Sequence, residues 1–573
     1  MHESVAPEAL ASKAVNQYRG RDVFSYLALR YCLQAPIARK DSWSEDNAIQ
    51  AVLGSPRGRY LRSYHFKSFS TGQIEHRQLM VPGPTEALAE AVLLSHCAKQ
   101  WEIERYDKLF SYFPTEISDR QGYFAAYMIG LRSRQRKISE ICLSDPEATV
   151  SYFDIEKFYP SITPAVARYA WDSFAVRSLM SDRLRRVGEK LISNHAFETD
   201  GRSILTGPMF SHFIANLVLK VVDDHAVEYP ATYIRYVDDI TLVGSENSIR
   251  RSVEAISDDL AALGLSLHKE NPNKTLTVSA REWITSSGDF HDDPITTGWM
   301  RLVSDIKKLL IFRPDDAFNL EAALLKEGFR FPIPDYTLAR RDRSIFEKVR
   351  RLGIWGWLFA KSRNVSIERI VSSANSLRDQ LEKECSDLFG SAGELSIFQR
   401  KRRVSKLRYR LGRLAYLSSY NSLSTFGEAA QKWPELAFHS ALLRAIVSGD
   451  CSRVIEMGSN VSQAAGQIFR ATGRLATFSR PISSEAEHQG LAILLLNGVS
   501  VEATVRSIQH PLVKFAAGGV DLDLITYPRG FVQEIACLHG LGPPRHIETM
   551  RNAFDLDQDI ILDALEFDYG YYL

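Results

Sequence analysis

The most informative stretch of this chain is Ala231-Thr-Tyr-Ile-Arg-Tyr-Val-Asp-Asp-Ile-Thr-Leu-Val-Gly244. The residues on either side of Asp238 and Asp239 are β-branched or aromatic, which predicts two short strands joined by a turn at the aspartates. Adjacent carboxylates at the tip of an apolar hairpin repel each other, and a bound divalent cation would relieve that repulsion. The pattern indicates a Mg²⁺ site, although an Asp-Asp pair is also ordinary turn chemistry.

Two further motifs precede this hairpin. Thr149-Val-Ser-Tyr-Phe-Asp154 predicts an apolar strand that ends in a carboxylate, and Phe158-Tyr-Pro-Ser161 follows it as a turn. Thr206-Gly-Pro-Met-Phe-Ser211 predicts a loop that opens a helix. In this order the three motifs resemble the palm motifs of reverse transcriptases, which favours a functional site over turn chemistry alone.

The resemblance implies a metal centre that extends nucleic acid. A hydroxyl attacks the α-phosphate of a nucleotide while two Mg²⁺ ions about 4 Å apart, or Mn²⁺ in their place, clamp the attacking and leaving oxygens. Asp154 and Asp238 are the expected bridging ligands because they come from separate strands that can lie side by side. Asp239 is the expected third ligand.

The resemblance also implies a set of substrate-binding residues. Tyr159 would place its ring beneath the sugar, where the ring excludes a 2′-hydroxyl and selects deoxynucleotides; an ordinary core tyrosine is the alternative. Phe158, Gly207, Pro208 and Tyr236 are expected to line the same substrate site.

Basic residues on either side of the palm are candidates for phosphate contacts. Lys274 follows a helix expected from about Ser248 to Gly264, and the resemblance places a lysine here as general acid for the departing pyrophosphate. Lys269 lies nearby and remains an alternative. Upstream, Arg132 begins a basic run that either contacts template or triphosphate or forms a solvated face.

One loop departs from the reverse-transcriptase pattern. Many templated enzymes carry Gln-Gly where this chain has Thr206-Gly207. Gly207 still permits close approach of a nucleic-acid backbone, but the lost amide is a group expected to follow the template–primer duplex. The departure favours DNA synthesis without a conventional template.

Composition bounds the class of protein. The chain has 573 residues, 45% apolar and 24% charged, which is ordinary for a soluble protein of several domains. The formal net charge is +1, so any nucleic-acid surface must be local. The six cysteines show no Cys-x-x-Cys spacing and fit a reducing compartment. With neither a signal-peptide pattern nor a long apolar run, we expect a cytoplasmic protein with no membrane contact.

The chain is expected to divide into four regions. Residues 1–148 form a helical lead-in and fingers, with a hairpin from Tyr60 to Val81 and a helix from Pro82-Gly-Pro-Thr85 to about Trp101. Residues 149–290 form the palm with its catalytic aspartates. Residues 291–395 form a thumb-like helical region, and residues 396–573 form a basic α-helical domain with HEAT-like repeats. The expected fold class is α+β in the right-hand polymerase portion and all-α after it.

A basic stretch opens the last region. Arg400-Lys-Arg-Arg-Val-Ser-Lys-Leu-Arg-Tyr-Arg-Leu-Gly-Arg413 holds eight basic residues among fourteen and no acidic residue. Arg400, Arg402, Arg403 and Lys406 are expected to contact nucleic-acid phosphates. A solvated helix face or a protein contact is the alternative.

A palm followed by a long basic helical region is similar to the bacterial abortive-infection and "unknown group" defence-associated reverse transcriptases. This resemblance implies an antiphage DNA polymerase that uses dNTPs, primes from a protein hydroxyl so that the DNA product is covalently attached, and assembles as a homo-oligomer. The tyrosines Tyr569, Tyr571 and Tyr572 could prime synthesis or form an aromatic plug. The alternatives are a templated reverse transcriptase bound to a dedicated non-coding RNA and a catalytically silent nucleic-acid-binding scaffold; the intact aspartates argue against the scaffold.

Overall fold

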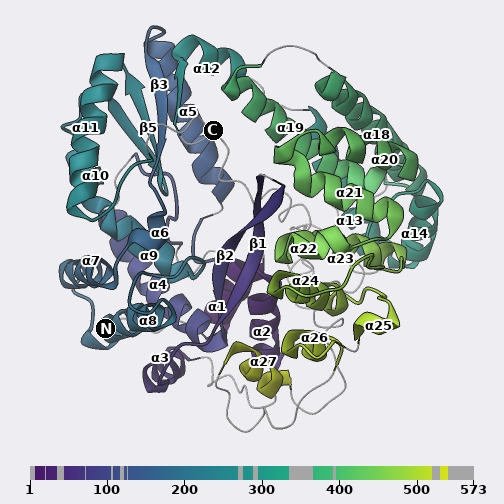
Figure 1. The fold of residues 1–573 in the computed structure, drawn as a ribbon, viewed down its shortest axis with the longest axis horizontal. Coiled ribbons are helices and arrows are strands. Elements are labelled where there is room, and N and C mark those ends of the chain that lie inside the picture. The colour runs from purple at the N-terminus through teal and green to yellow at the C-terminus, as the bar shows by residue number, and fades with distance from the viewer. Residues whose placement is uncertain are drawn as a thin grey trace. The chain divides into compact units, whose positions relative to one another are not determined.

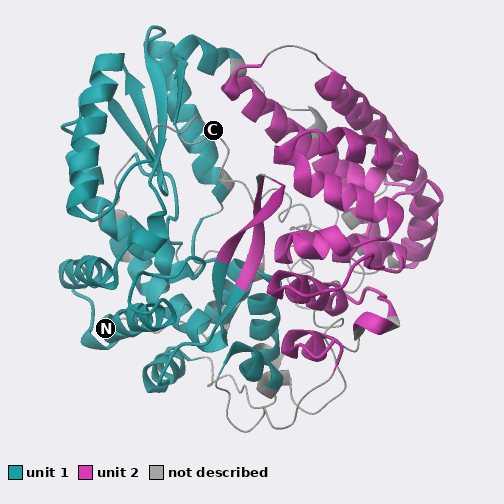
Figure 2. Ribbon diagram, in the orientation of Figure 1, with its two compact units in different colours: residues 1–62, 79–289, 524–540 teal, residues 63–78, 290–523, 541–573 magenta. Residues whose placement is uncertain are grey.

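The computed structural model describes residues 7–19, 21–34, 44–70, 72–104, 108–115, 122–125, 127–268, 275–287, 294–333, 365–390, 395–506, 508–518 and 530–539. The chain forms two compact units, which Figure 2 colours separately. Unit 1 comprises residues 1–62, 79–289 and 524–540, and unit 2 comprises residues 63–78, 290–523 and 541–573.

A four-stranded antiparallel sheet organises unit 1 (Figure 1). Its strands, in the order β4-β5-β3-β6, are β4 (Thr232–Tyr236), β5 (Asp239–Gly244), β3 (Thr149–Asp154) and β6 (Leu276–Ser279). The β4–β5 hairpin and the strand ending at Asp154 therefore occur where the sequence predicts them. Their β-branched and aromatic residues suit a pleated surface that is buried on both faces.

Helices cover both faces of this sheet. Tyr152 and Thr241 are cross-strand partners, and α5 (Tyr127–Ser144) covers their face, where Arg134 Nη2 donates to Thr241 Oγ1 at 2.7 Å. The alternating residues Ile240 and Leu242 point to the other face and share one core with buried residues of α11 (Glu246–Ala262). Figure 1 shows α5 and α11 on opposite sides of the strands.

Unit 1 contains further helices, most of which contribute buried residues to one hydrophobic core. They are α1 (Pro7–Arg19), α2 (Val23–Gln34), α3 (Glu45–Gly54), α4 (Pro84–Glu104), α6 (Phe158–Ser161), α7 (Pro164–Arg177), α8 (Asp182–Glu198), α9 (Met209–Val218), α10 (Lys220–His225), α12 (Ala280–Ser287) and α27 (Phe531–His539). The predicted helix after Pro82 is α4. The helix predicted to stop at Gly264 is α11, and Gly264 has a φ of +73° that suits a glycine stop.

The predicted hairpin near residue 60 also forms. It consists of β1 (Tyr60–Ser70) and β2 (Gln73–Pro82), which pair as a separate two-stranded sheet. The ends of the hairpin belong to unit 1, whereas its outer residues 63–78 belong to unit 2. Within unit 2 the backbone N–H of Phe66 donates to Asn460 Oδ1 at 3.0 Å, and His76 Nε2 lies 2.8 Å from the carbonyl oxygen of Glu456.

Apart from these hairpin residues, the described part of unit 2 is helical. Its elements are α13 (Pro294–Phe312), η3 (Pro314–Asp316), α14 (Ala317–Lys326), α18 (Ile367–Gly390), α19 (Ile397–Leu417), α20 (Tyr420–Gln431), η5 (Pro434–Leu436), α21 (Ala437–Ser448), α22 (Ser452–Glu456), α23 (Ser459–Thr472), α24 (Glu485–Leu496), α25 (Ala503–Arg506) and α26 (Pro511–Ala516). The prediction of a mixed α+β chain whose C-terminal region is helical is therefore confirmed. The HEAT-like repeat stays a prediction. Among the described residues no helix has the length and apolar character needed to cross a membrane.

Candidate metal centre and its surroundings

Three aspartates from two sequence motifs meet at one end of the four-stranded sheet. Asp154 ends β3 and lies opposite Asp239, the first residue of β5, in the antiparallel register. Asp238 precedes Asp239, and one carboxylate oxygen from each of the three side chains lies within 4.8 Å of the other two. Asp154 is only 7% exposed, whereas Asp238 and Asp239 are half-buried, so the cluster is partly accessible to solvent. The structure brings together the three ligands expected from the sequence.

The donor chemistry of this cluster fits a hard divalent cation. Three carboxylates at this distance repel one another, and oxygen donors of this kind suit Mg²⁺ and Mn²⁺. Close by, the backbone N–H of His268 donates to the carbonyl oxygen of Asp154 at 2.9 Å. His268 Nε2 lies 3.8 Å from Asp154 Oδ2, so His268 would partly offset the negative charge when it is protonated.

The turn between β4 and β5 has an uncommon backbone conformation. Val237 has a φ of 58°, in the left-handed region that a β-branched residue rarely adopts. Its N–H donates to the buried Ser111 hydroxyl at 2.7 Å, and its carbonyl oxygen accepts from Arg235 Nη1 at 2.8 Å. Such conformations cost on the order of 1–3 kcal/mol and persist where surrounding contacts impose them. These contacts therefore set the direction of the peptide that carries Asp238.

A buried ion pair supports the turn from behind. Arg235 is fully buried, and its Nε donates to Asp223 Oδ1 at 2.8 Å. Asp223 also accepts from the Tyr233 hydroxyl at 3.0 Å, and Arg235 Nη1 donates to Asn216 Oδ1 at 3.0 Å. Burial opposes the charge of Arg235, but the contact with Asp223 raises its pKa above the ordinary value. Removing either partner would leave an uncompensated buried charge.

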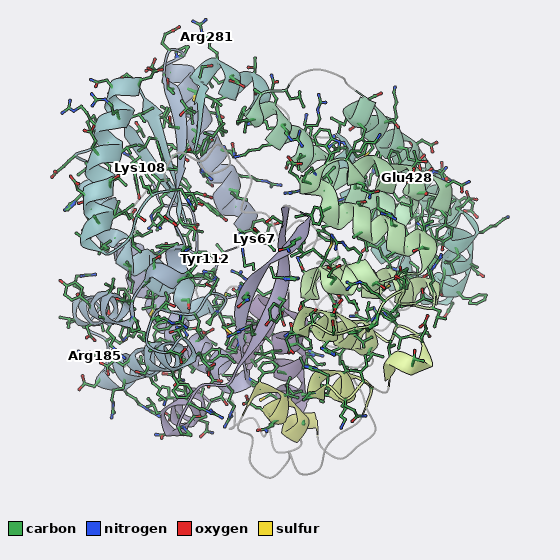
Figure 3. The ribbon with its side chains drawn as sticks, in the orientation of Figure 1. Lys67, Lys108, Tyr112, Arg185, Arg281 and Glu428 are labelled. Carbon is green, nitrogen blue, oxygen red and sulfur yellow. The ribbon has the colours of Figure 1, made fainter. Side chains whose placement is uncertain are left out.

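Tyr159 lies in α6, directly after the strand that carries Asp154. Its hydroxyl is hydrogen-bonded to His212 Nδ1 of α9. The His212 ring is stacked on Tyr112, with centroids 4.0 Å apart (Tyr112 is labelled in Figure 3). Arg21 Nη2 lies 3.0 Å from His212 Nε2 and 2.9 Å from the Tyr112 hydroxyl oxygen. Tyr159 is half-buried and its hydroxyl is held by His212, so its ring has a defined orientation.

These contacts define the protonation of His212. A guanidinium only donates, so Nε2 must accept from Arg21 and the ring proton must lie on Nδ1, which donates to the Tyr159 oxygen. Burial and the neighbouring Arg21 lower the pKa of His212 well below its usual value, which keeps the ring neutral. Sequence analysis did not single out His212, because its role depends on Arg21 and Tyr112, which are distant in the chain.

Gly207, Pro208 and Phe158 are buried. Gly207 has a φ of +124°, and a Cβ there would lie 2.7 Å from the carbonyl oxygen of Met80 in β2. The lack of a side chain at Gly207 therefore permits the close approach of β2, and the role of Gly207 in substrate binding stays a prediction. Pro208 is buried at the N-terminus of α9, and Phe158 is buried in the hydrophobic core.

The basic run of α5 divides between surface and core. Arg132 is exposed, as a phosphate contact requires. Arg134, from the same run, is buried, and its guanidinium lies over the rings of Tyr152 and Tyr236, 5.4 and 6.0 Å from their centroids. Arg134 therefore packs on the sheet instead of forming a solvated face. Tyr236 is half-buried beneath it.

A buried carboxyl group at the N-terminus of α9 is a further feature that the sequence pattern did not reveal. Glu90 of α4 is fully buried, and its Oε2 accepts from the Tyr18 hydroxyl at 2.6 Å and from the N–H of Met209 at 3.2 Å. Burial raises the pKa of Glu90 to about 7, although these hydrogen bonds oppose the shift. Glu90 therefore anchors the loop that follows Gly207.

The basic stretch forms helix α19, but its cations differ in environment. Arg402 is 8% exposed, whereas Arg403 and Lys406 are half-buried. The phosphate contacts of these residues stay a prediction. Arg400 Nε lies 2.6 Å from Glu435 Oε1. Arg410 pairs with Glu384, with Nη2 and Oε2 2.6 Å apart. Protein contacts thus occupy part of this basic surface.

Several expected site residues lie outside the described residues. They are Lys274, its alternative Lys269, and the C-terminal tyrosines Tyr569, Tyr571 and Tyr572.

No protein-family model matches this chain, and no curated protein matches its sequence.

Proposed function

We propose that this chain is a metal-dependent DNA polymerase of the reverse-transcriptase type, in which residues 149–290 form the palm and residues 1–148, with the β1–β2 hairpin, form the lead-in and fingers. The observation that carries the proposal is the convergence of Asp154, Asp238 and Asp239 within 4.8 Å at a strained hairpin turn. A turn pair with no function would not need a third carboxylate from another strand or a left-handed valine beside it.

The residues of the site support this chemistry in distinct ways. Two Mg²⁺ ions, or Mn²⁺, would supply charge stabilisation at the α-phosphate of a dNTP and activation of the attacking hydroxyl. Asp154 and Asp238 would hold them from two strands, and Asp239 would complete the donor set. Tyr159, anchored by His212, would position the sugar. Arg132 is exposed for a triphosphate contact.

The biological role that fits the resemblance is antiphage defence of the abortive-infection class in the cytoplasm. We propose protein-primed synthesis, a covalently attached DNA product and a homo-oligomeric assembly. A dedicated non-coding RNA as template is the competing mode. Sequencing the nucleic acid that accompanies the purified chain would distinguish protein-linked DNA from a defined bound RNA.

Substituting the carboxylates tests the polymerase proposal. Asp154→Asn and Asp238→Asn are expected to reduce dNTP incorporation by at least a thousandfold, because each substitution removes a ligand of the metal clamp. Asp200→Asn is the matched control, since Asp200 is an exposed residue whose carboxylate lies 3.3 Å from Arg202. Incorporation of labelled dNTP and the thermal unfolding midpoint are measured together. Full activity in a folded Asp154→Asn chain would refute the proposal.

A further inference from the structure

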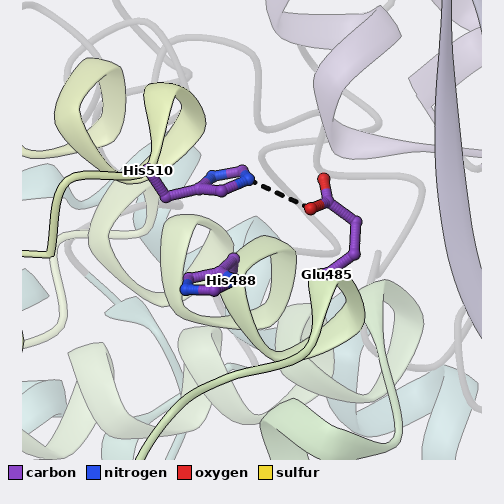
Figure 4. Close-up of side chains that lie close together, drawn as sticks. All are labelled: Glu485, His488 and His510. Atoms are coloured by element: carbon purple, nitrogen blue, oxygen red, sulfur yellow. Dashed lines mark hydrogen bonds and ion pairs between the residues drawn. The ribbon is translucent and has the colours of Figure 1, made fainter.

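Three metal-ligating side chains lie together in unit 2, outside the aspartate centre. Glu485 and His488 occupy the first turn of α24, and His510 directly precedes α26 (Figure 4). One donor atom from each lies within 4.8 Å of the other two. His510 Nε2 is 3.1 Å from Glu485 Oε2, and the rings of His488 and His510 are stacked with centroids 4.5 Å apart.

The backbone that carries these side chains is fixed on both elements. Ser484 and Glu487 form a capping box at the start of α24, in which Ser484 N–H donates to Glu487 Oε2 at 2.8 Å. Glu487 is also 2.7 Å from Arg480 Nη1, so this second carboxylate is already engaged. On the other element, Pro511 follows His510 and fixes the first turn of α26.

The donor set is suited to a transition metal. Two imidazoles and one carboxylate are ligands that Zn²⁺ accepts, with bonds of about 2.0–2.1 Å that place tetrahedral donors about 3.3 Å apart. Glu485 Oε2 and His510 Nε2 already have nearly this separation. His488 is half-buried, and one of its ring nitrogens lies within 4.8 Å of the other two donor atoms. Because its ring is stacked on that of His510, binding of one ion by both histidines requires the His488 ring to turn.

We propose that Glu485, His488 and His510 bind a divalent transition-metal ion, with Zn²⁺ as the reference ion and water in the remaining coordination positions. The ion ties the first turn of α24 to the start of α26. Its nitrogen donors distinguish this site from the aspartate centre, which suits Mg²⁺. The proposal does not depend on polymerase activity.

Calorimetric titration of the full chain with Zn²⁺ tests this site. An Asp154→Asn background and excess Mg²⁺ suppress binding at the aspartate centre. Glu485→Gln and His488→Ala are each expected to weaken the tightest Zn²⁺ binding at least tenfold, because loss of even an outer-shell partner costs that much. The control is His225→Ala. His225 Nδ1 lies 2.9 Å from Asp259 Oδ1 at the surface, and this pair offers two ligand groups to a metal ion instead of three. This control should leave Zn²⁺ binding unchanged.

A second readout separates specific from adventitious binding. Zn²⁺ should raise the thermal unfolding midpoint of the parent by several degrees, and a chelator should reverse the shift. The Glu485→Gln chain should show no such shift. Glu485 is exposed and glutamine preserves its size, so this variant is expected to fold. Equal Zn²⁺ affinity in the parent and in Glu485→Gln would show an adventitious ion only and overturn the proposal, as would a parent that binds no Zn²⁺.

Discussion

At the scale of single residues, the site depends on side chains that restrict one another. Val237 adopts a left-handed conformation because Ser111 and Arg235 bind its peptide groups. Tyr159 is oriented because His212 holds its hydroxyl, and His212 is held in turn by Arg21. Each functional group is thus positioned by a partner that is itself buried or hydrogen-bonded, which is what a preorganised site requires.

Tyr159 is expected to select deoxynucleotides through its ring. Tyr159→Ala should raise the catalytic efficiency for ribonucleotides relative to deoxynucleotides by about tenfold or more, since shape discrimination of this kind is worth about 1–3 kcal/mol. Tyr159→Phe is the matched control, because it keeps the ring and loses only the hydrogen bond to His212. Steady-state kinetics with both nucleotide types measure the ratio. An unchanged ratio in Tyr159→Ala would exclude this residue as the selector.

Glu90 is expected to make stability depend on pH. Burial raises its pKa from 4.5 to about 7 in the folded chain, so the folded state binds more protons than the unfolded state between these values. Its stabilisation is therefore present below about pH 4.5 and is lost as pH rises through 7, by on the order of 3 kcal/mol. Glu90→Gln should remove this contribution.

Denaturant unfolding of both chains from pH 5 to pH 8 measures the effect of Glu90. Glu254→Gln is the control, because Glu254 is an exposed residue paired with Arg250 at 3.1 Å. If the free energy of unfolding of Glu90→Gln changes with pH in the same way as that of the parent, Glu90 is not the group that causes the pH dependence.

At the scale of elements, helix α19 shows why a run of like charges does not define a surface. A helix turns every residue to a different direction, so Arg402 enters the interior while Arg403 and Lys406 stay half-buried. Arg402 lies over Phe398, 4.7 Å from the ring centroid. Arg402 therefore stabilises the helix by packing as well as by charge.

The cations of α19 are expected to separate into two functional classes. Replacing Arg403 and Lys406 with glutamine should reduce the salt dependence of nucleic-acid binding by about one unit of slope per lost phosphate contact. Arg402→Gln should instead lower the free energy of unfolding by about 1–3 kcal/mol and leave the slope unchanged, because its guanidinium is buried. Binding titrations at several salt concentrations and denaturant unfolding measure the two effects. A slope that changes only in Arg402→Gln would reverse this assignment.

At the scale of the whole molecule, the described residues include two groups of metal-ligating side chains, which differ in chemistry and belong to different units. The oxygen donors of Asp154, Asp238 and Asp239 belong to unit 1, and the mixed donors of Glu485, His488 and His510 belong to unit 2. Selective metal addition can therefore perturb one unit at a time, since Mg²⁺ and Zn²⁺ prefer different donors.

Protein-linked DNA is the expected product of the whole molecule. After incubation with dNTPs, nuclease and protease digestion should release a peptide that carries a nucleotide on a side-chain oxygen. Mass spectrometry of the digest identifies the residue, and the Asp154→Asn chain supplies the control. An active enzyme whose DNA is entirely free of protein would contradict protein priming.

The local secondary structure around the site could be predicted from the amino-acid sequence alone. The strands of the β4–β5 hairpin and the strand that ends at Asp154 follow from their β-branched and aromatic residues. Helix α4 after Pro82 and the stop of α11 follow from proline and glycine. The convergence of the aspartates was also predictable, because the order of the motifs and the pairing of the strands place the two segments at the same end of the sheet.

Which side chains contact one another is evident only from the tertiary structure. Several of these contacts join segments that are separated in the sequence. They are the hydrogen bond of Tyr159 with His212, the ion pair of Arg235 with Asp223, the approach of Gly207 to Met80 and the cluster around His510. The burial of Arg134 likewise depends on packing partners in the strands of the sheet. Local sequence governs backbone conformation through short-range sterics and hydrogen bonds, whereas burial and electrostatic partners are set by contacts that no local pattern contains.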